Sequence, residues 1–156
     1  KMKKLICSII AVILVCSINL NVYASSEEKR VDGSVLTNEM FSEVTYESLQ
    51  KGNILNRVIG RITNNGNGSV NIYGSVYGSS ICDKLTLDMT LQRLVNGSWI
   101  NVGSFSNTEK NNSYMIKSYN ISVTKGYYYR LKLVGVVTKG STTESQTGIT
   151  DGLLIK

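Results

Sequence analysis

Residues 85–105 read LTLDMTLQRLVNGSWINVGSF, in which two runs of alternating apolar residues meet at Asn96-Gly97. Asn-Gly between two such runs is the strongest short-range signal of a β-hairpin, because a type I′ turn needs positive φ at both central residues. With these two residues as the loop, Leu94 lies opposite Trp99. The stretch therefore predicts an antiparallel hairpin and defines its register.

The alternation of side chains along a strand gives this hairpin two faces. The nearly all-apolar face, predicted to be the core face, carries Leu85, Leu87, Met89, Leu91, Ile100 and Val102. The other face carries Asp88, Thr90, Gln92, Leu94, Trp99, Asn101 and Phe105. In this register Leu91 lies opposite Val102. The only tryptophan lies away from the main apolar row, so burial of Trp99 in the main core would contradict the register.

Residues 1–24 have the pattern of a helical secretory signal peptide. A basic head with three lysines precedes an apolar run that is short for a membrane span. The small residue Ala24 predicts cleavage before Ser25. A lipoprotein signal would use Cys16, but Val15 stands where such signals carry Gly, Ala or Ser. The rest of the chain divides into a polar, partly disordered segment at 25–52, with one short strand or helical turn, and one β domain at 53–156.

The charge of the chain argues against nucleic acid as a partner. There are 17 basic and 11 acidic residues, a formal net charge of +6, and three of the basic residues belong to the signal segment. The remaining 14 basic and 11 acidic residues give +3, without the clustered basic stripe that nucleic-acid binding needs. We therefore expect no nucleic-acid partner. The signal segment predicts secretion, and the richness in Asn, Lys and Ile is typical of a bacterial source. We expect the protein to be released or held noncovalently at the cell surface, with no membrane attachment after signal removal.

The chain contains no histidine, so it lacks the usual general base and the commonest metal ligand. Without histidine to activate it, Cys82 is interpreted as a small buried apolar residue. Asp83 with Asp88, or Glu144 with Asp151, could form an acid–base pair, but Asp83 and Asp88 differ in parity and should point to opposite faces. Three of these carboxylates, Asp83, Glu144 and Asp151, are candidate calcium ligands, although solvated charges are the simpler interpretation. We expect no enzyme activity, no cofactor and no metal; a carboxylate- or metal-dependent hydrolase is the last alternative.

The rest of the chain also alternates at strand spacing. A Gly- and Asn-rich turn separates residues 53–63 from 70–77 and predicts a second hairpin, with Ile62 paired to Val70. Further along we expect a polar loop at 107–112, a weaker strand at 114–123, the longest strand at 127–138, and one or two short strands at 144–155. Seven or eight short strands predict an all-β protein with an antiparallel immunoglobulin-like β-sandwich. A jelly roll or a small barrel is the alternative.

Aromatic and arginine side chains on the outward faces are the best candidates for binding. They are Tyr73, Tyr77, Arg57 and Arg61 in the second hairpin, and Trp99 with Leu94 in the first. Tyr73 and Tyr77 are about 13 Å apart at ~3.3 Å per residue. Such side chains suit sugar rings or partner surfaces, although aromatic residues also occur on sheets through β-propensity alone. The expected partner is an extracellular protein or a glycan.

Short motifs along the chain resemble those of a known family. They are Gly52-Asn53-Ile54-Leu55, the Gly66-Asn67-Gly68 turn, Cys82-Asp83-Lys84-Leu85, Leu91-Gln92-Arg93, Asn96-Gly97-Ser98-Trp99 and Gly126-Tyr127-Tyr128-Tyr129-Arg130. Their order and spacing are similar to the landmarks of a family of small secreted Firmicutes proteins catalogued only as a domain of unknown function. The resemblance covers about Gly52 to Ile155 and implies secretion and a β-sandwich, but no activity. Some members carry a histidine where this chain has Val136-Val137, so no role of that histidine carries over.

The strand–turn–strand at 119–133 is also similar to the end of immunoglobulin-like and fibronectin-type domains, in which a Gly turn leads into a Tyr-rich strand. Together these features predict a secreted, non-catalytic domain for extracellular surface recognition or structural interaction. A carbohydrate-binding module that uses exposed Tyr and Trp side chains is the first alternative. Fold resemblance alone does not establish function, so both hypotheses depend on the surface residues.

Overall fold

The computed structural model describes residues 28–48 and 53–156, and each regular element within them is a β-strand. The strands are β1 (Arg30–Val31), β2 (Ser34–Thr37), β3 (Phe41–Glu47), β4 (Leu55–Gly66), β5 (Ser69–Val95), β6 (Ser98–Ser122), β7 (Tyr127–Lys139), β8 (Thr142–Ile149) and β9 (Gly152–Ile155). The predicted signal peptide and its cleavage site between Ala24 and Ser25 lie outside the described residues. Among the residues described, no helix has the length and apolar character needed to cross a membrane.

The strands form one sheet in the order β1-β2-β9-β7-β5-β4-β3, with β6 paired to β5 and β8 paired to β7. Among the described strand pairs, only β2 with β9 is parallel. This mixed sheet of nine strands corrects the expectation of seven or eight purely antiparallel strands. The parallel pair joins the two ends of the domain, where no short hairpin loop imposes antiparallel pairing.

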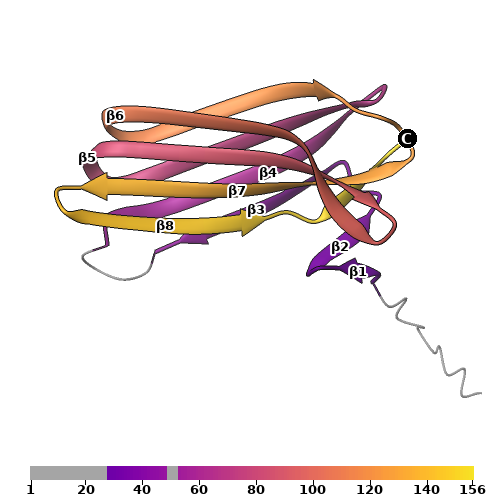
Figure 1. Ribbon diagram of the computed structural model, residues 1–156, viewed down its shortest axis with the longest axis horizontal. Helices are drawn as coiled ribbons and strands as arrows, with labels where there is room; N and C mark the ends of the chain where they lie inside the picture. The colour runs from indigo at the N-terminus through magenta and orange to yellow at the C-terminus, as the bar shows by residue number, and fades with distance from the viewer. Residues whose placement is uncertain (1–27, 49–52) are drawn as a thin grey trace, which may run out of the picture.

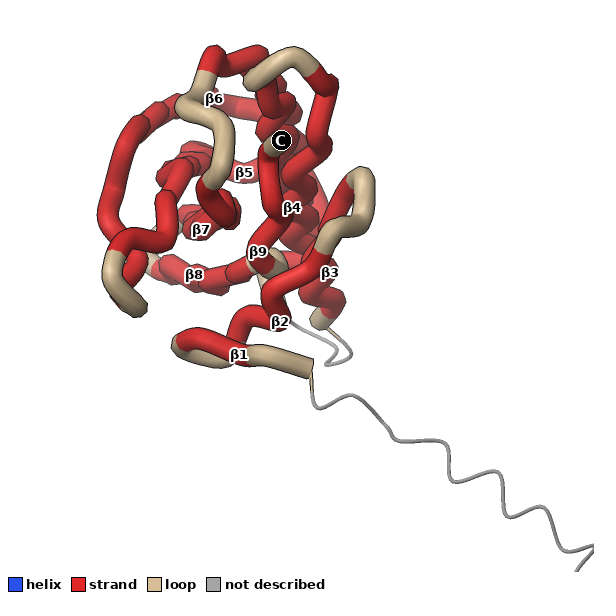
Figure 2. The backbone as a smooth tube through the Cα atoms, turned by 90° about the vertical axis from the view of Figure 1, so that its right-hand side faces the viewer, coloured by secondary structure: helices blue, strands red, loops and turns tan. Residues whose placement is uncertain are grey.

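The two longest strands bend, so each contributes to two opposite walls of the molecule. The ladder between β5 and β6 is interrupted between Tyr77 and Cys82, which divides β5 into limbs at 69–77 and 82–95. The first limb pairs with β4 and the second with β7. Figure 1 shows β5 and β6 running the length of the molecule. Figure 2 shows the sheet curled, with β3 and β4 on one side and β7 and β8 on the other.

The core lies between the two limbs of β5 and the strands beside them. A Cβ atom added at Gly74, on the first limb, would lie 2.6 Å from the Sδ atom of Met89 on the second. A side chain at position 74 would force that of Met89 to move, so the close packing favours glycine. The predicted core residues of the second limb, Leu85, Leu87, Met89 and Leu91, are all fully buried. This confirms the core face of the strand.

The hairpin predicted at Asn96-Gly97 is present. These residues have φ angles of 49° and 80°, as a type I′ turn requires. Leu94 pairs with Trp99, as the two-residue loop predicts. Trp99 is half-buried and does not belong to the main core. The register nearest the turn is therefore confirmed.

A β-bulge corrects the register farther from the turn. Leu91 pairs with the residue after Val102, which leaves Val102 without a partner on β5. The extra residue reverses the alternation that follows, so Phe105 packs against the core instead of lying on the outer face. The prediction that Ile100 and Val102 face the core is wrong, since both are exposed. Ile100 lies opposite Arg93, where β5 no longer presents an apolar residue to the core.

The second hairpin is also present, with a different register. Ile62 pairs with Ile72 and not with Val70. Because the side-chain period is two, this shift of two residues keeps all three side chains buried. The polar stretch at 107–112 is part of β6 and not a loop, because backbone pairing with β5 needs no apolar side chains on an edge strand.

Residues 30–47 carry three strands, where the sequence predicted one short strand or a helical turn. β1 and β2 form a hairpin through Asp32-Gly33, whose φ angles are 49° and 80°. β2 joins the sheet beside β9, and β3 pairs with β4 along seven residues. Because β1 and β2 are too short to show a periodic pattern, their structure depends on contacts with the rest of the sheet.

Candidate functional site

Four predicted binding residues lie together on the outer face of the wall formed by β3, β4, the first limb of β5 and residues 114–122 of β6. Strand pairing places them in two rows across this wall. One row contains Glu47, Arg57, Tyr77 and Tyr114; the other contains Glu43, Arg61, Tyr73 and Ser118. We call this surface the arginine–tyrosine face. The rows are four residues apart along β4, or about 13 Å at ~3.3 Å per residue.

Side chains in the first row stack on one another. The guanidinium carbon of Arg57 lies 4.5 Å from the centroid of the Tyr77 ring. The rings of Tyr77 and Tyr114 are stacked with their centroids 6.1 Å apart. Because Arg57 and Tyr114 belong to the strands on either side of Tyr77, both faces of its ring are occupied. The outward part of this row therefore consists of ring edges, hydroxyl groups and the guanidinium group.

Arg61 holds the second row together through an ion pair and a contact with an aromatic ring. Arg61 forms an ion pair with Glu43, and its guanidinium carbon lies 5.6 Å from the ring centroid of Phe41. Between the two rows lies a row in which Ile59 and the exposed side chain of Ile116 flank the polar residue Ser75. Each of the two outer rows pairs one arginine with one glutamate, so the charges within them cancel. The face is therefore neutral and partly apolar.

Trp99 and Leu94 lie apart from this face, on the outer side of the opposite wall. The indole Nε1 of Trp99 donates a hydrogen bond to the backbone oxygen of Val31 over 3.1 Å. One side of the indole faces Arg130, whose guanidinium carbon is 4.4 Å from the ring centroid. The predicted binding residues therefore belong to two separate regions, and Trp99 uses much of its surface in contacts within the protein.

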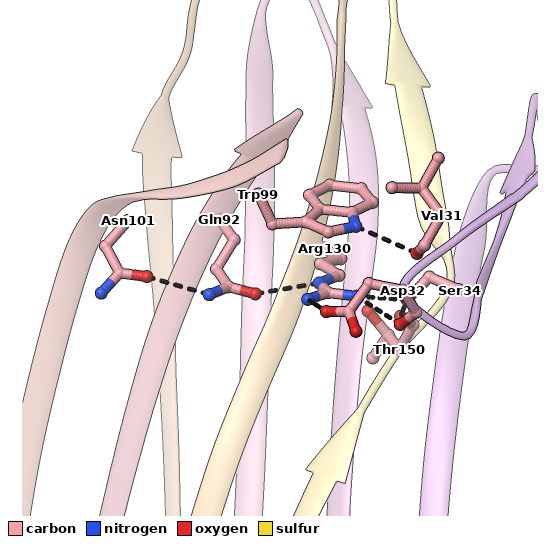
Figure 3. A network of polar contacts seen from close by, with 8 residues as sticks. All are labelled: Val31, Asp32, Ser34, Gln92, Trp99, Asn101, Arg130 and Thr150. Atoms are coloured by element: carbon pink, nitrogen blue, oxygen red, sulfur yellow. Dashed lines mark hydrogen bonds and ion pairs between the residues drawn. The ribbon is translucent and has the colours of Figure 1, made fainter. Parts of the chain in front are cut away.

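Arg130 is the centre of the second region (Figure 3). Its side chain is only 3% exposed, and it donates through Nε to Gln92 Oε1 at 2.9 Å. Nη1 donates to the backbone oxygen of Asp32 and to Ser34 Oγ, and Nη2 forms an ion pair with Asp32 Oδ2 at 2.7 Å. We call the connected set the Trp99 cluster: Val31, Asp32, Ser34, Gln92, Trp99, Asn101, Arg130 and Thr150. A buried guanidinium requires this many partners.

The Trp99 cluster fastens the β1–β2 hairpin to the sheet. Ser34 Oγ donates to the backbone oxygen of Thr150, and the N–H of Val35 donates to Asp151 Oδ1. The hairpin itself has only two register pairs, and isolated two-stranded hairpins are marginally stable. Contacts made by the cluster therefore stabilise the β1–β2 hairpin, which would be only marginally stable by itself.

A cleft of about 340 Å³ adjoins the Trp99 cluster. Its lining residues are Asp32, Gln92, Gly97, Ser98, Trp99, Arg130, Lys132 and Ile149. Gln92 and Arg130 already make hydrogen bonds inside the protein, whereas the Asp32 side chain is 73% exposed. The cleft is thus polar, and its buried groups, Gln92 and Arg130, stabilise the fold through hydrogen bonds within the protein.

The carboxylates considered for catalysis or calcium binding accept hydrogen bonds from nearby groups. The donors are the N–H of Gly140 for Asp83, Ser106 Oγ for Asp88, the N–H of Leu55 for Glu144 and the N–H of Val35 for Asp151. Within residues 28–48 and 53–156, no three Cys, Asp or Glu side chains gather as a metal site would require. The positions of these carboxylates are explained by local structure.

Cys82 lies at the bend of β5 and is fully buried. Its Sγ donates to the backbone oxygen of Ser80 over 3.1 Å. Burial, more than any nearby charge, raises the pKa of the Cys82 thiol above its ordinary value. A buried, protonated thiol is a poor nucleophile, in keeping with the interpretation of Cys82 as a small apolar residue.

Arg130 and Asp32 are not among the binding residues predicted from the sequence. Two signals point to them. An arginine on a strand with apolar residues on both faces needs a carboxylate partner if it is buried. Asp32-Gly33 is a turn signal of the same kind as Asn96-Gly97, and it indicates a hairpin in the segment expected to be partly disordered.

No family model matches the chain, and no curated protein is significantly similar to it. Its candidate sites are therefore assigned from its own residues.

Proposed function

We propose that the protein is a secreted, non-catalytic domain with an immunoglobulin-like β-sandwich architecture, and that it recognises a protein partner outside the cell through the arginine–tyrosine face. The observation that carries this proposal is the pair of Arg–Tyr rows on a neutral wall of the sheet. Tyrosine and arginine are enriched among the residues that dominate binding energy at protein interfaces. The curled sheet, with β3–β4 facing β7–β8, supports the sandwich architecture.

The stacking within the first row favours a protein partner over a glycan. Sugar rings bind best against an aromatic face that is open to solvent. Both faces of the Tyr77 ring are covered by its neighbours Arg57 and Tyr114. Ring edges, hydroxyl groups and guanidinium groups remain, and these suit the mixed polar and apolar surface of a protein.

A capture experiment tests the proposal. Wild-type protein and the double variant Arg57→Ala/Tyr77→Ala are immobilised and exposed to the secreted and cell-surface fractions of the source organism. A matched double variant, Thr143→Ala/Thr147→Ala on β8, controls for surface change elsewhere. We expect the wild type and the control to retain the same protein and the Arg57/Tyr77 variant to lose it at least tenfold. Equal retention by all three would rule out this face as the binding surface.

Glycan binding is a second candidate because polar side chains gather at the end of the same face. Asn71 Nδ2 donates to Ser118 Oγ and to Asn120 Oδ1. Tyr114, six residues from Asn120 along β6 and toward the other end of the face, is 50% exposed. A glycan array separates the two functions. Binding that Tyr114→Ala abolishes would favour the glycan, whereas a blank array would exclude it.

Secretion has its own test. Protein recovered from the culture medium should have an N-terminus at Ser25, as cleavage after Ala24 requires. An intact N-terminus, or retention inside the cell, would contradict secretion without affecting the binding surface.

A further inference from the structure

β6 is an edge strand along its whole length. In the described part of the chain it pairs only with β5, over residues 98–122. In Figure 1 one limb runs along the upper boundary of the molecule, and the other lies below it and bends down at the right. The outer side of such a strand presents unpaired N–H and C=O groups that can pair with another strand.

β6 also carries exposed apolar side chains. They are Ile100, Val102, Tyr114 and Ile116, which are 40%, 42%, 50% and 43% exposed. Edge strands are normally protected by bulges, by proline or by charged side chains. The first limb of β6 has the bulge at Val102, but the ladder from 114 to 122 is continuous. The second limb is therefore the least protected edge of the wall that carries the arginine–tyrosine face.

Charge does not protect this second limb either. Its one charged residue is Lys117, whose Nζ lies 2.9 Å from the carboxylate of Glu109 on the first limb. This hydrogen bond holds the ammonium group between the two limbs, where it neutralises Glu109. Two copies of the limb would therefore bring no unpaired like charges together.

We propose that residues 114–118 of β6 pair antiparallel with the same residues of a second copy, in a dimer with twofold symmetry. An antiparallel strand is complementary to itself about a twofold axis, so one sequence supplies both sides of the ladder. With the axis near Ile116, the exposed side chains of Tyr114 and Ile116 from both copies cover one another.

The two limbs of β6 favour a second copy over an extended peptide. The limbs lie in opposite walls, so the molecule presents two edges on one side. A single peptide strand can pair with only one of these two edges. A second copy presents the same two edges at the same spacing.

This dimer does not depend on the proposed function. A twofold axis perpendicular to the wall would keep both arginine–tyrosine faces on the same side and join them into one surface. The proposed partner binding and the proposed dimer can be disproved independently, because a face that binds no partner leaves the dimer intact. A monomeric protein can still bind through a single face.

Analytical ultracentrifugation of the protein tests the dimer. We expect the wild type to form a concentration-dependent dimer and Ile116→Lys to be a monomer. The matched control Ile149→Lys, which alters an exposed isoleucine on the edge strand β8, should remain a dimer. A wild type that stays monomeric at the highest concentration reached, or an Ile116→Lys variant that still dimerises, would overturn the proposal.

A cross-linking experiment keeps the test decisive if Ile116→Lys does not fold. Ile116→Cys places a thiol near the twofold axis and should form a covalent dimer under mild oxidation, whereas Ile149→Cys should not. The native thiol of Cys82 is buried and should not take part. Equal cross-linking of the two variants, or none, would overturn pairing at this edge.

Discussion

Arg57 and Arg130 each lie against an aromatic ring on the outer side of the sheet, but their surroundings differ. The Arg57 side chain is 39% exposed and is 3.7 Å from Glu47. Arg130 is 3% exposed because the β1–β2 hairpin covers it, and each of its guanidinium nitrogens has a partner. An exposed pair contributes little to stability, whereas a buried guanidinium makes its partners essential. The same kind of contact therefore stabilises the fold in one region and leaves an arginine and a tyrosine at the surface in the other, where we propose that they bind a partner.

The largest expected effect comes from removing the buried guanidinium. Arg130→Met should lower the free energy of unfolding by about 3 kcal/mol, because it leaves the buried groups of Gln92 and Ser34 without their donor. Urea unfolding measures the loss. The matched change Arg57→Met should cost less than about 1 kcal/mol. Equal losses in the two variants would remove the distinction between the regions.

The indole of Trp99 gives the next largest effect. Trp99→Phe keeps an aromatic ring beside Arg130 but loses the hydrogen bond to Val31, which should cost about 1 kcal/mol. Tyr77→Phe is the matched change on the arginine–tyrosine face and should leave stability unchanged. Thermal unfolding monitored by circular dichroism compares the two. A larger loss from Tyr77→Phe would reverse the roles assigned to the regions.

A smaller effect is expected from the charge of Asp32. Asp32→Asn retains a residue that tolerates the positive φ of the turn, so it removes mainly the ion pair with Arg130. Because the Asp32 carboxylate is largely exposed, we expect a loss below about 1 kcal/mol that shrinks as salt is added. Urea unfolding at low and high ionic strength measures this. A salt-independent loss of the size expected for Arg130→Met would show that the turn, and not the charge, had been damaged.

The smallest effect concerns the Glu109–Lys117 pair between the limbs of β6. The hydrogen bond with Lys117 lowers the pKa of Glu109, and the same bond raises the pKa of Lys117. The stabilisation from Glu109 is present above the pKa that its carboxyl group has in the unfolded chain. It is lost as the pH falls through the lowered pKa of that group in the folded state. That from Lys117 is present below its unfolded pKa and is lost as the pH rises through its raised folded pKa.

Glu109→Gln should therefore flatten the acid side of the stability–pH curve slightly, as urea midpoints across pH would show. A steeper acid limb in Glu109→Gln would contradict the direction of the pKa change.

Much of the second limb of β5 could be predicted from the sequence, because its alternation has one apolar face and its turn is Asn-Gly. The prediction was wrong where one extra residue changed the parity, since nothing in the local pattern marks Val102 as a bulge. The positions of Tyr73 and Tyr77 on one face followed from period two alone. Arg130 could not be assigned in the same way, because its partner Asp32 is 98 residues away and the connection exists only in the folded molecule.

The bend of β5 and β6 has a consequence for unfolding. Each strand continues from one wall of the molecule into the other, so neither wall can come apart without breaking the ladder that supports its opposite. We therefore expect local unfolding to be confined to the chain ends and the β1–β2 hairpin. We expect the amide hydrogens that are hydrogen-bonded within the ladders of both walls to exchange with solvent through a single cooperative event.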